Sequence, residues 1–336
     1  MGLGEEMVMV SPNTYQTSVV TYLDVSGLKE AVWKSLGEPA LASRIEGMLL
    51  RLQRRCIELN KRQRQSAQVP NFRARALSDS IILTCPIVSG DPIVLDNALR
   101  LIAVIVSVYQ IEAATYGFFI RGAITVGPHC DLGDICFGPA LIEAYEAEQK
   151  LANWPRVIVL PKALELIARG RHPYLKRDDA GITYVDYLLL STVNSIIQSR
   201  IPEKKQAGVN PFSWVSVMKE HKTALEVAVK TLARDTPQFL LTLSKYHSLA
   251  QYHNRYLRRV IQGGKNFPMT EALELMLSRQ KGMTKDRISR VVSESTLLLS
   301  DVNEKLKACL IDMRHTFAPL QRRRSRSQYL ISWYHT

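Results

Sequence analysis

The chain has 336 residues, of which 46% are hydrophobic and 22% charged, and it carries a net charge of +13 at pH 7. The length suits two domains rather than one, and the composition is that of a soluble globular protein with a sizeable core. Five scattered cysteines without a CxxC pair argue against a disulfide framework or a structural zinc site and favour a reducing cytoplasm.

The N-terminal segment opens with acidic residues and lacks a basic n-region, so no secretory signal is expected. A β-rich run over residues 18–23, bounded by Asp24 and Gly27, predicts the first strand. Helices are expected over residues 28–36 and 40–65. The second has apolar residues at spacings of three and four, which form one face of a helix.

A hairpin and a buried helix are expected next. Residues 72–85 predict two strands with Ser78 and Asp79 at their turn. Asp91 is expected to N-cap a helix over residues 93–114. The longest apolar stretch of the chain lies in this helix and is about half the length that spans a bilayer. The sequence therefore predicts a core helix and no membrane span.

Further strand and helix signals alternate up to residue 190. Strands are expected over 118–126, 135–137, 156–160 and 181–187, and helices from 138 and 161. This order predicts an α+β fold. Its mixed sheet, covered by helices, is expected to be close to a ferredoxin-like core with extensions.

Strand signals disappear after residue 190. Helices are expected at about 212–234, 237–262, 270–280 and 284–313. We therefore expect an α/β domain over residues 14–190 and a basic helical domain over residues 191–336. Residues 1–190 carry 20 basic and 20 acidic residues, and residues 191–336 carry 24 basic against 11 acidic. This asymmetry indicates either an anionic partner, such as nucleic acid, nucleotide or a membrane surface, or a solvated basic helical surface.

Asp24 and Asp79 are the candidate metal ligands. Two aspartates that meet at strand ends are what a two-metal phosphoryl-transfer site needs, because Mg²⁺ or Mn²⁺ takes a few hard oxygen ligands and fills its other positions with phosphate and water. Each residue also has a structural explanation: Asp24 as a helix N-cap and Asp79 as a turn aspartate.

The turn after Asp24 is the candidate phosphate site. Its free N–H groups can hold a triphosphate at the start of the following helix, and Gly27 lets the backbone approach the ligand. The residues expected to bind the nucleotide are Val25, Ser26, Gly27, Leu28, Lys29, Ser78 and Ser80.

The order of these signatures resembles the class III nucleotidyl (adenylate/guanylate) cyclase domain over about residues 18–160. It resembles still more a group of uncharacterised bacterial cyclase-like proteins. The matching signatures are Asp24-x-x-Gly27, Ser78-Asp79-Ser80, Arg121-x-x-Ile124-x-x-Gly127 and the helix from Gly138 to Glu148. The resemblance implies that Asp24 and Asp79 bind the metal ions. It also implies a homodimer, since sites of this class form between two subunits.

The chain departs from the cyclase pattern at two positions. Ile142 and Glu146 stand where active cyclases usually carry an asparagine and an arginine, and a carboxylate facing a triphosphate is repulsive. Either Arg121, Arg156 or Lys29 supplies the missing cation, or the chemistry differs, or the domain binds without turnover. Arg121 itself is either a buried, paired arginine or a site residue.

Two functions follow as expectations. One is a metal-dependent enzyme that converts a nucleoside triphosphate to a cyclic nucleotide signal. The other is a catalytically degenerate sensor that binds nucleotide, or binds nucleic acid through the basic helical region. Two side assignments accompany them: Glu143, Glu146 and Glu148 are expected on a solvated helix face, and His253 and Asn254 either reach over the site or pack in the interior.

Overall fold

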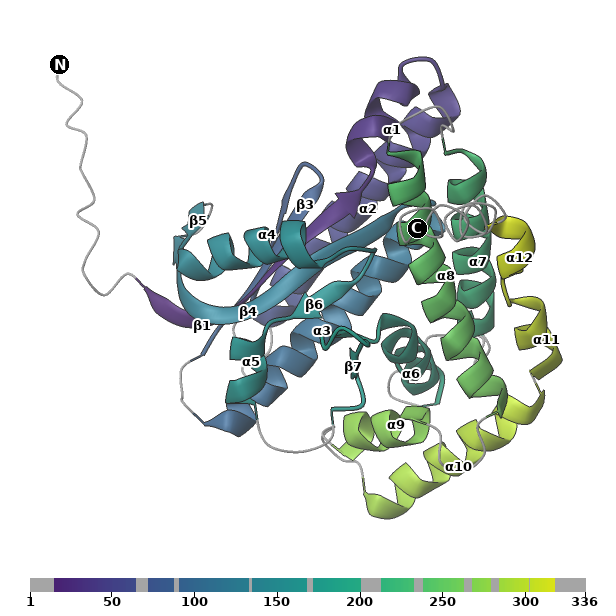
Figure 1. Cartoon of the computed structure of the whole chain (residues 1–336). Coiled ribbons are helices and arrows are strands. Elements are labelled where there is room, and N and C mark those ends of the chain that lie inside the picture. The colour runs from purple at the N-terminus through teal and green to yellow at the C-terminus, as the bar shows by residue number, and fades with distance from the viewer. Residues whose placement is uncertain are drawn as a thin grey trace, which may run out of the picture.

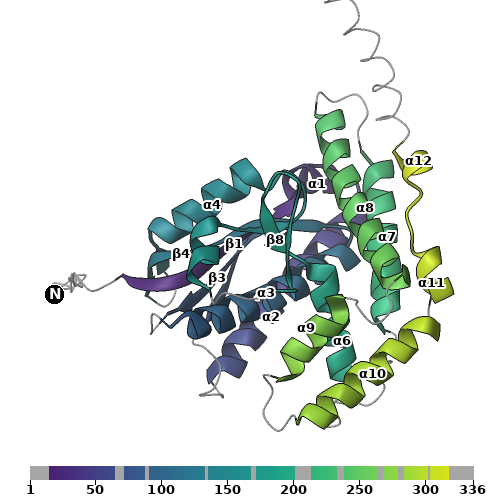
Figure 2. The same ribbon diagram turned by 60° about the horizontal axis from the view of Figure 1, so that its bottom comes forward.

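A computed structural model gives the fold of the chain (Figures 1 and 2). It describes residues 15–64, 72–87, 91–132, 135–167, 172–200, 213–232, 238–262, 268–278, 284–301 and 303–317. The sequence also predicts a linker over residues 199–211, of which residues 201–211 lie outside the described residues, as do residues 318–336.

A mixed sheet of eight strands forms the centre of the described structure, in the order β2-β3-β1-β4-β6-β8-β7, with β5 paired to β4. All neighbouring strands are antiparallel except β4 and β6. The strands are β1 (Gln16–Ser26), β2 (Arg73–Leu77), β3 (Ser80–Pro86), β4 (Phe119–Leu132), β5 (Ile135–Phe137), β6 (Val157–Val159), β7 (Leu175–Arg177) and β8 (Thr183–Val185).

Helices cover both faces of this sheet, as Figure 1 shows. One face carries α2 and α3, and the other carries α4 and α5. The helices of this part are α1 (Leu28–Ser35), α2 (Pro39–Arg64), α3 (Pro92–Thr115), α4 (Pro139–Leu151) and α5 (Pro161–Leu166). The expected mixed sheet covered by helices is therefore present, while its ferredoxin-like character stays a prediction.

From Tyr187 onward, every described element is a helix. These are α6 (Tyr187–Arg200), α7 (Ser213–Lys230), α8 (Phe239–Gln262), α9 (Pro268–Ser278), α10 (Lys285–Asp301), α11 (Asn303–Ala308) and α12 (Met313–Thr316). Helices α6 and α7 pack against α3, so this set is joined to the sheet by a shared core (Figure 2). Because parts of the region are not described, its all-helical character stays a prediction, as does the two-domain division.

The prediction for residues 181–190 differs from the structure. The strand expected over 181–187 is only β8, and Tyr187 already begins α6, which runs across the predicted boundary at residue 190. Asp186 starts this helix: its carbonyl accepts the Leu190 N–H at 3.0 Å, and its side chain accepts from Tyr252 at 2.7 Å. The start of α6 thus depends on a contact with α8, which local sequence does not reveal.

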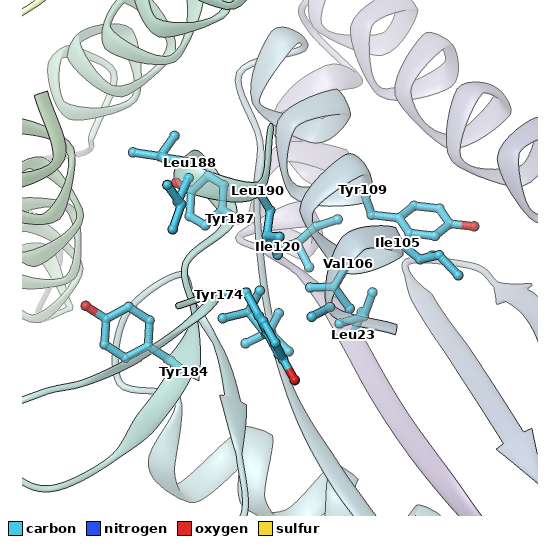
Figure 3. Close-up of a cluster of buried hydrophobic side chains, with 14 of the residues drawn as sticks. Leu23, Ile105, Val106, Tyr109, Ile120, Tyr174, Tyr184, Tyr187, Leu188 and Leu190 are labelled. Atoms are coloured by element: carbon cyan, nitrogen blue, oxygen red, sulfur yellow. The ribbon is translucent and has the colours of Figure 1, made fainter. Parts of the chain in front are cut away.

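The hydrophobic core lies between α3 and the sheet. Figure 3 shows Leu23 of β1 and Ile120 of β4 beside Ile105 and Val106 of α3, all nearly inaccessible to solvent. Within the described residues, α3 alone is long and apolar enough to cross a membrane, and 56% of its most apolar window is buried inside the protein. Packing on the sheet, α6 and α7 accounts for this hydropathy, as the predicted core helix requires.

Local signals placed the elements that surround the site. Asp91 caps α3 through its side chain, which accepts the Ile93 N–H at 2.9 Å, as predicted. Strands β2 and β3 form the predicted hairpin with Ser78 and Asp79 at its turn. The helix expected from about residue 270 begins two residues earlier, at Pro268, so Thr270 is not its N-cap.

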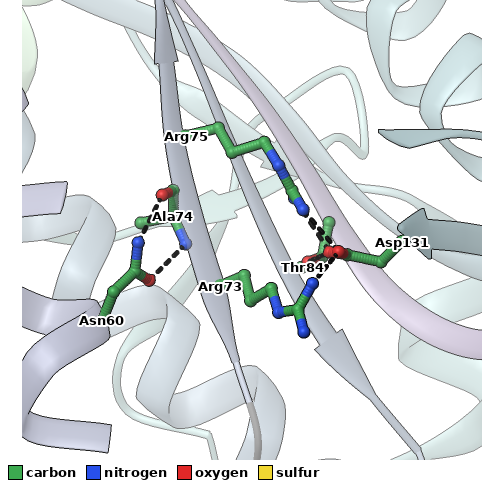
Figure 4. Close-up of polar contacts among 6 residues, drawn as sticks. All are labelled: Asn60, Arg73, Ala74, Arg75, Thr84 and Asp131. Carbon is green, nitrogen blue, oxygen red and sulfur yellow. Dashed lines mark hydrogen bonds and ion pairs between the residues drawn. The ribbon is translucent and has the colours of Figure 1, made fainter. Parts of the chain in front are cut away.

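Hydrogen bonds and ion pairs stabilise the β2–β3 edge of the sheet (Figure 4). Asn60 of α2 exchanges two 2.9 Å hydrogen bonds with the backbone of Ala74 in β2. Arg75, together with Arg73, binds Asp131 at the end of β4, which bends toward β2. Burial opposes ionisation of Asp131, but the hydrogen bonds from Arg75 outweigh it and lower its pKa. The hairpin that carries Asp79 is therefore held on both sides.

Candidate functional site

Asp24 lies near the end of β1, between two strands. Its Cα partners are Ser80 in β3 and Arg121 in β4. Because successive strand residues alternate between faces, Asp24 points to the same face as Tyr22, whose ring meets Tyr145 of α4 at 5.3 Å. The carboxylate therefore lies on the face that α4 covers, 17% exposed.

Asp79 lies at the tip of the β2–β3 hairpin, one residue before the partner of Asp24. Burial raises the pKa of the Asp24 carboxyl, Arg121 opposes this rise, and the negative charge of Asp79 adds to it. The structure thus brings the two predicted aspartates within electrostatic reach of one another. A carboxylate pair of this kind favours a bound cation, since a cation relieves the repulsion.

The serines of the hairpin complete this edge. Ser80 Oγ lies 2.7 Å from Tyr22 Oη, so both hydroxyls are already paired. Ser78 has a φ of 58°, a left-handed conformation that is costly for a residue with a side chain. Ser78 is exposed and Ser80 half-buried.

The turn after Asp24 is open at its glycine. Gly27 has a φ of 77°, and an added Cβ would meet no atom within 4 Å. It precedes α1 without a side-chain cap from the described residues, so the first N–H groups of this helix are free for an anion. Val25 and Leu28 bury their side chains beneath the turn, and Lys29 is exposed. Only the backbone of the two apolar residues can meet a ligand.

Arg121 links Asp24 to a carboxylate that sequence reasoning misplaced. Its Nε donates to Asp24 Oδ2 at 3.3 Å and lies 2.5 Å from Glu148 Oε1. The Glu148 side chain is fully buried, so its assignment to a solvated helix face is wrong. The signal was available: Ala140 and Ala144 are buried at four-residue spacing, which puts residue 148 on the inner face of α4.

Burial raises the pKa of Glu148 to about 7. The positive charge of Arg121 opposes this rise, while the negative charge of Asp24 adds to it. The site thus contains a carboxyl group that changes its ionisation near neutral pH, a property common in functional sites and in buried ion pairs alike.

The other glutamates of α4 do lie toward solvent or toward the sheet surface. Glu146 is 53% exposed and pairs with Lys150 at 2.7 Å. Glu143 accepts a hydrogen bond from Thr125 at 2.9 Å. Ile142 is 61% exposed, so the two positions that depart from the cyclase pattern both point away from Asp24 within one chain.

The guanidinium of Arg156 pairs with Asp178 and not with Asp24. It is 2% exposed, pairs with Asp178 at 2.5 Å, and stacks over Trp154 and Tyr184 at 5.0 and 5.6 Å. These partners lie on the β6–β8 side of the sheet and neutralise its charge. Arg156 therefore stabilises the fold and is not a residue of the candidate site.

His253 and Asn254 pack in the interior. His253 Nε2 donates to the Cys309 carbonyl at 3.0 Å, and Asn254 exchanges two 2.8 Å hydrogen bonds with the backbone of Ile311. Of their two sequence-based readings, interior packing is confirmed.

Within the described part of the chain, no three His, Cys, Asp or Glu residues group as a metal site. The available metal ligands are the two carboxylates of Asp24 and Asp79, a number that suits Mg²⁺ when substrate phosphates supply further oxygens.

No protein-family model and no curated protein matches the sequence. Among solved structures, the chain is similar to one described as a class III adenylyl cyclase-like ATP-binding protein from Pseudomonas aeruginosa, with 11% identity and a TM-score of 0.34. The match covers 61% of this chain and 40% of that protein. At this TM-score the likeness assigns neither a family nor a function.

Proposed function

We propose that the chain binds a nucleoside triphosphate with a divalent cation at the end of β1. One observation carries the proposal: two acidic side chains lie at the same sheet edge as an uncapped helix start whose glycine leaves room for a ligand. Carboxylates suit the cation, and free N–H groups at a helix start suit phosphate.

The residues present fit the proposed cation. Asp24 and Asp79 would hold Mg²⁺ or Mn²⁺, which when bound neutralises charge on phosphate oxygens. Arg121 now shares its charge between Asp24 and Glu148. With Asp24 engaged by a cation, Arg121 retains Glu148 as its partner, so the site loses no buried ion pair.

Nucleotide cyclisation is the reaction that this binding mode would serve. The 3′-oxygen forms a bond to the α-phosphorus, the bond from that phosphorus to the bridging oxygen breaks, and pyrophosphate leaves. The proton of the 3′-hydroxyl passes to solvent or to a base.

Binding without turnover is the second candidate, and α4 favours it. Glu146 and Ile142 lie on the outward face of α4, and neither is a cation. Glu146 forms an ion pair with Lys150. A protein that holds a nucleotide without converting it acts as a sensor. The excess of 13 positive charges after residue 190 suits a nucleic acid as the partner of its helical region.

Calorimetric titration with ATP and GTP, with and without Mn²⁺, tests the proposal. We expect cation-dependent binding that Asp24→Ala abolishes and that Glu46→Gln, which removes an exposed carboxylate on α2, leaves unchanged. A parallel assay for cyclic nucleotide and pyrophosphate separates the enzyme from the sensor. Equal binding by the wild type and Asp24→Ala would refute the site.

A further inference from the structure

Arg121 lies between two carboxylates that it contacts in different ways. Its Nε and Nη2 donate to one oxygen of Asp24, Oδ2, at 3.3 and 3.4 Å. Its Nε also lies 2.5 Å from Glu148 Oε1. Nε carries a single hydrogen, so it cannot donate a well-aligned hydrogen bond to both residues. The hydrogen points to Asp24, because Glu148 Oε1 accepts no hydrogen bond from any described residue.

The carboxyl group of Glu148 is therefore incompletely paired. Its side chain is fully buried, and its Oε2 accepts a hydrogen bond from Gln149 at 2.6 Å. Its Oε1 accepts none within the described part of the chain. A buried oxygen without a hydrogen bond is unfavourable, since solvent does not supply the missing donor. The guanidinium of Arg121 is already close enough to supply that donor, so a rotation of this side chain is sufficient.

Asp24 is in the opposite situation. Its side chain is 17% exposed, and its two hydrogen bonds from Arg121 are longer than is usual between charged groups. Both bonds go to Oδ2, and no described residue donates to Oδ1. Asp24 thus retains an oxygen for another ligand. Because the carboxylates of Asp24, Asp79 and Glu148 outnumber the charge of Arg121, that ligand should be a cation.

A divalent cation and a guanidinium on the same carboxylate repel each other. We propose that Arg121 is a displaceable counter-ion, which pairs with Asp24 in the absence of a divalent cation and transfers to Glu148 when the cation binds. The proposal rests on the cation and nucleotide site proposed above and adds a control of its affinity. Glu148 is then a positioning residue: it does not touch the cation, and it favours cation binding by accepting Arg121.

The affinity of the full chain for Mn²⁺ alone, followed by the electron paramagnetic resonance signal of free Mn²⁺, tests this transfer. At pH 8 Glu148 is mostly ionised, since its pKa is about 7. Glu148→Gln leaves a neutral acceptor, and hydrogen bonds to neutral groups are about half as strong as those to charged groups. Arg121 then remains on Asp24, and we expect the Kd for Mn²⁺ to rise about tenfold.

A second substitution separates this transfer from a general effect of charge. Arg121→Gln removes the displaceable group, so in that background Glu148→Gln should change the Kd by less than about twofold. The double variant should bind Mn²⁺ at least as tightly as the wild type. Glu143→Gln is a matched control, because it removes a carboxylate of α4 that accepts from Thr125, and it should leave the Kd unchanged. Thermal unfolding verifies the fold of each variant.

The outcomes separate the two proposals. If the wild type binds no Mn²⁺, this inference fails, and calorimetry with nucleotide decides the proposed function on its own. If Glu148→Gln binds Mn²⁺ as tightly as the wild type, only the role of Glu148 is overturned. Equal losses from Glu148→Gln with and without the guanidinium would also overturn it, since Glu148 would then act by its charge alone. Should Arg121→Gln be too unstable, the double variant still decides, because failure to recover the affinity lost in Glu148→Gln contradicts the transfer.

Discussion

Arg121 Nε lies 2.5 Å from Glu148 Oε1 and 3.3 Å from Asp24 Oδ2, so one guanidinium serves two carboxyl groups in the layer between the sheet and α4. One positive charge cannot neutralise both. The fully buried carboxyl of Glu148 is the one whose pKa rises to about 7. The net charge of the site therefore depends on pH in the physiological range.

Glu148→Gln should become more stable relative to the wild type as pH rises from about 4.5 to about 7. In this window folded Glu148 retains its proton while the unfolded chain has lost it, so rising pH lowers the wild-type free energy of unfolding. A shift from 4.5 to about 7 corresponds to about 3 kcal/mol. Urea unfolding at several pH values measures the difference. A pH-independent difference would contradict the raised pKa, and Glu146→Gln serves as an exposed control.

Arg121→Met should destabilise the protein by about 3–5 kcal/mol, because it leaves a buried carboxylate without its cation. Removing the carboxylate as well, in Arg121→Met with Glu148→Leu, should restore much of this loss. A double-mutant cycle measured by urea unfolding gives the coupling energy. Additive effects of the two substitutions would show that the 2.5 Å contact contributes nothing to stability.

Local sequence predicted most strands and put Asp79 next to Ser80, the strand partner of Asp24, because antiparallel pairing and a two-residue turn fix which residues are neighbours. Local sequence did not predict the side-chain burial that depends on tertiary packing. The alanine spacing marks residue 148 as inward-facing, but only the docking of α4 on β4 shows that the Glu148 carboxyl is fully buried beside Arg121.

Ser78→Gly should stabilise the protein by about 1 kcal/mol. Ser78 has a φ of 58° at the hairpin tip, where glycine avoids the steric cost of a Cβ. Glycine also increases the entropy of the unfolded chain, which reduces the gain. The midpoint of urea unfolding should rise for Ser78→Gly and not for Ser78→Ala, which keeps the Cβ. A similar rise in both variants would assign the effect to the hydroxyl instead.

The stacked pair of His221 and His253 should make the protein acid-sensitive. The rings lie 4.9 Å apart at an angle of 2°, between α7 and α8. Burial lowers the pKa of both, that of His253 to about 4. Between about pH 6.5 and 4 the unfolded chain therefore binds protons that the folded chain does not, and falling pH lowers the free energy of unfolding.

His253→Gln tests this, because glutamine can still donate to the Cys309 carbonyl but does not titrate. Relative to the wild type, the variant should gain up to about 3 kcal/mol as pH falls from 6.5 to about 4. Glu148 acts in the opposite direction over part of this range, so the wild-type profile alone hides both effects. His315→Gln, at an exposed position, should leave the profile unchanged. A constant difference between His253→Gln and the wild type would show that His253 is protonated in the folded protein as easily as in the unfolded chain.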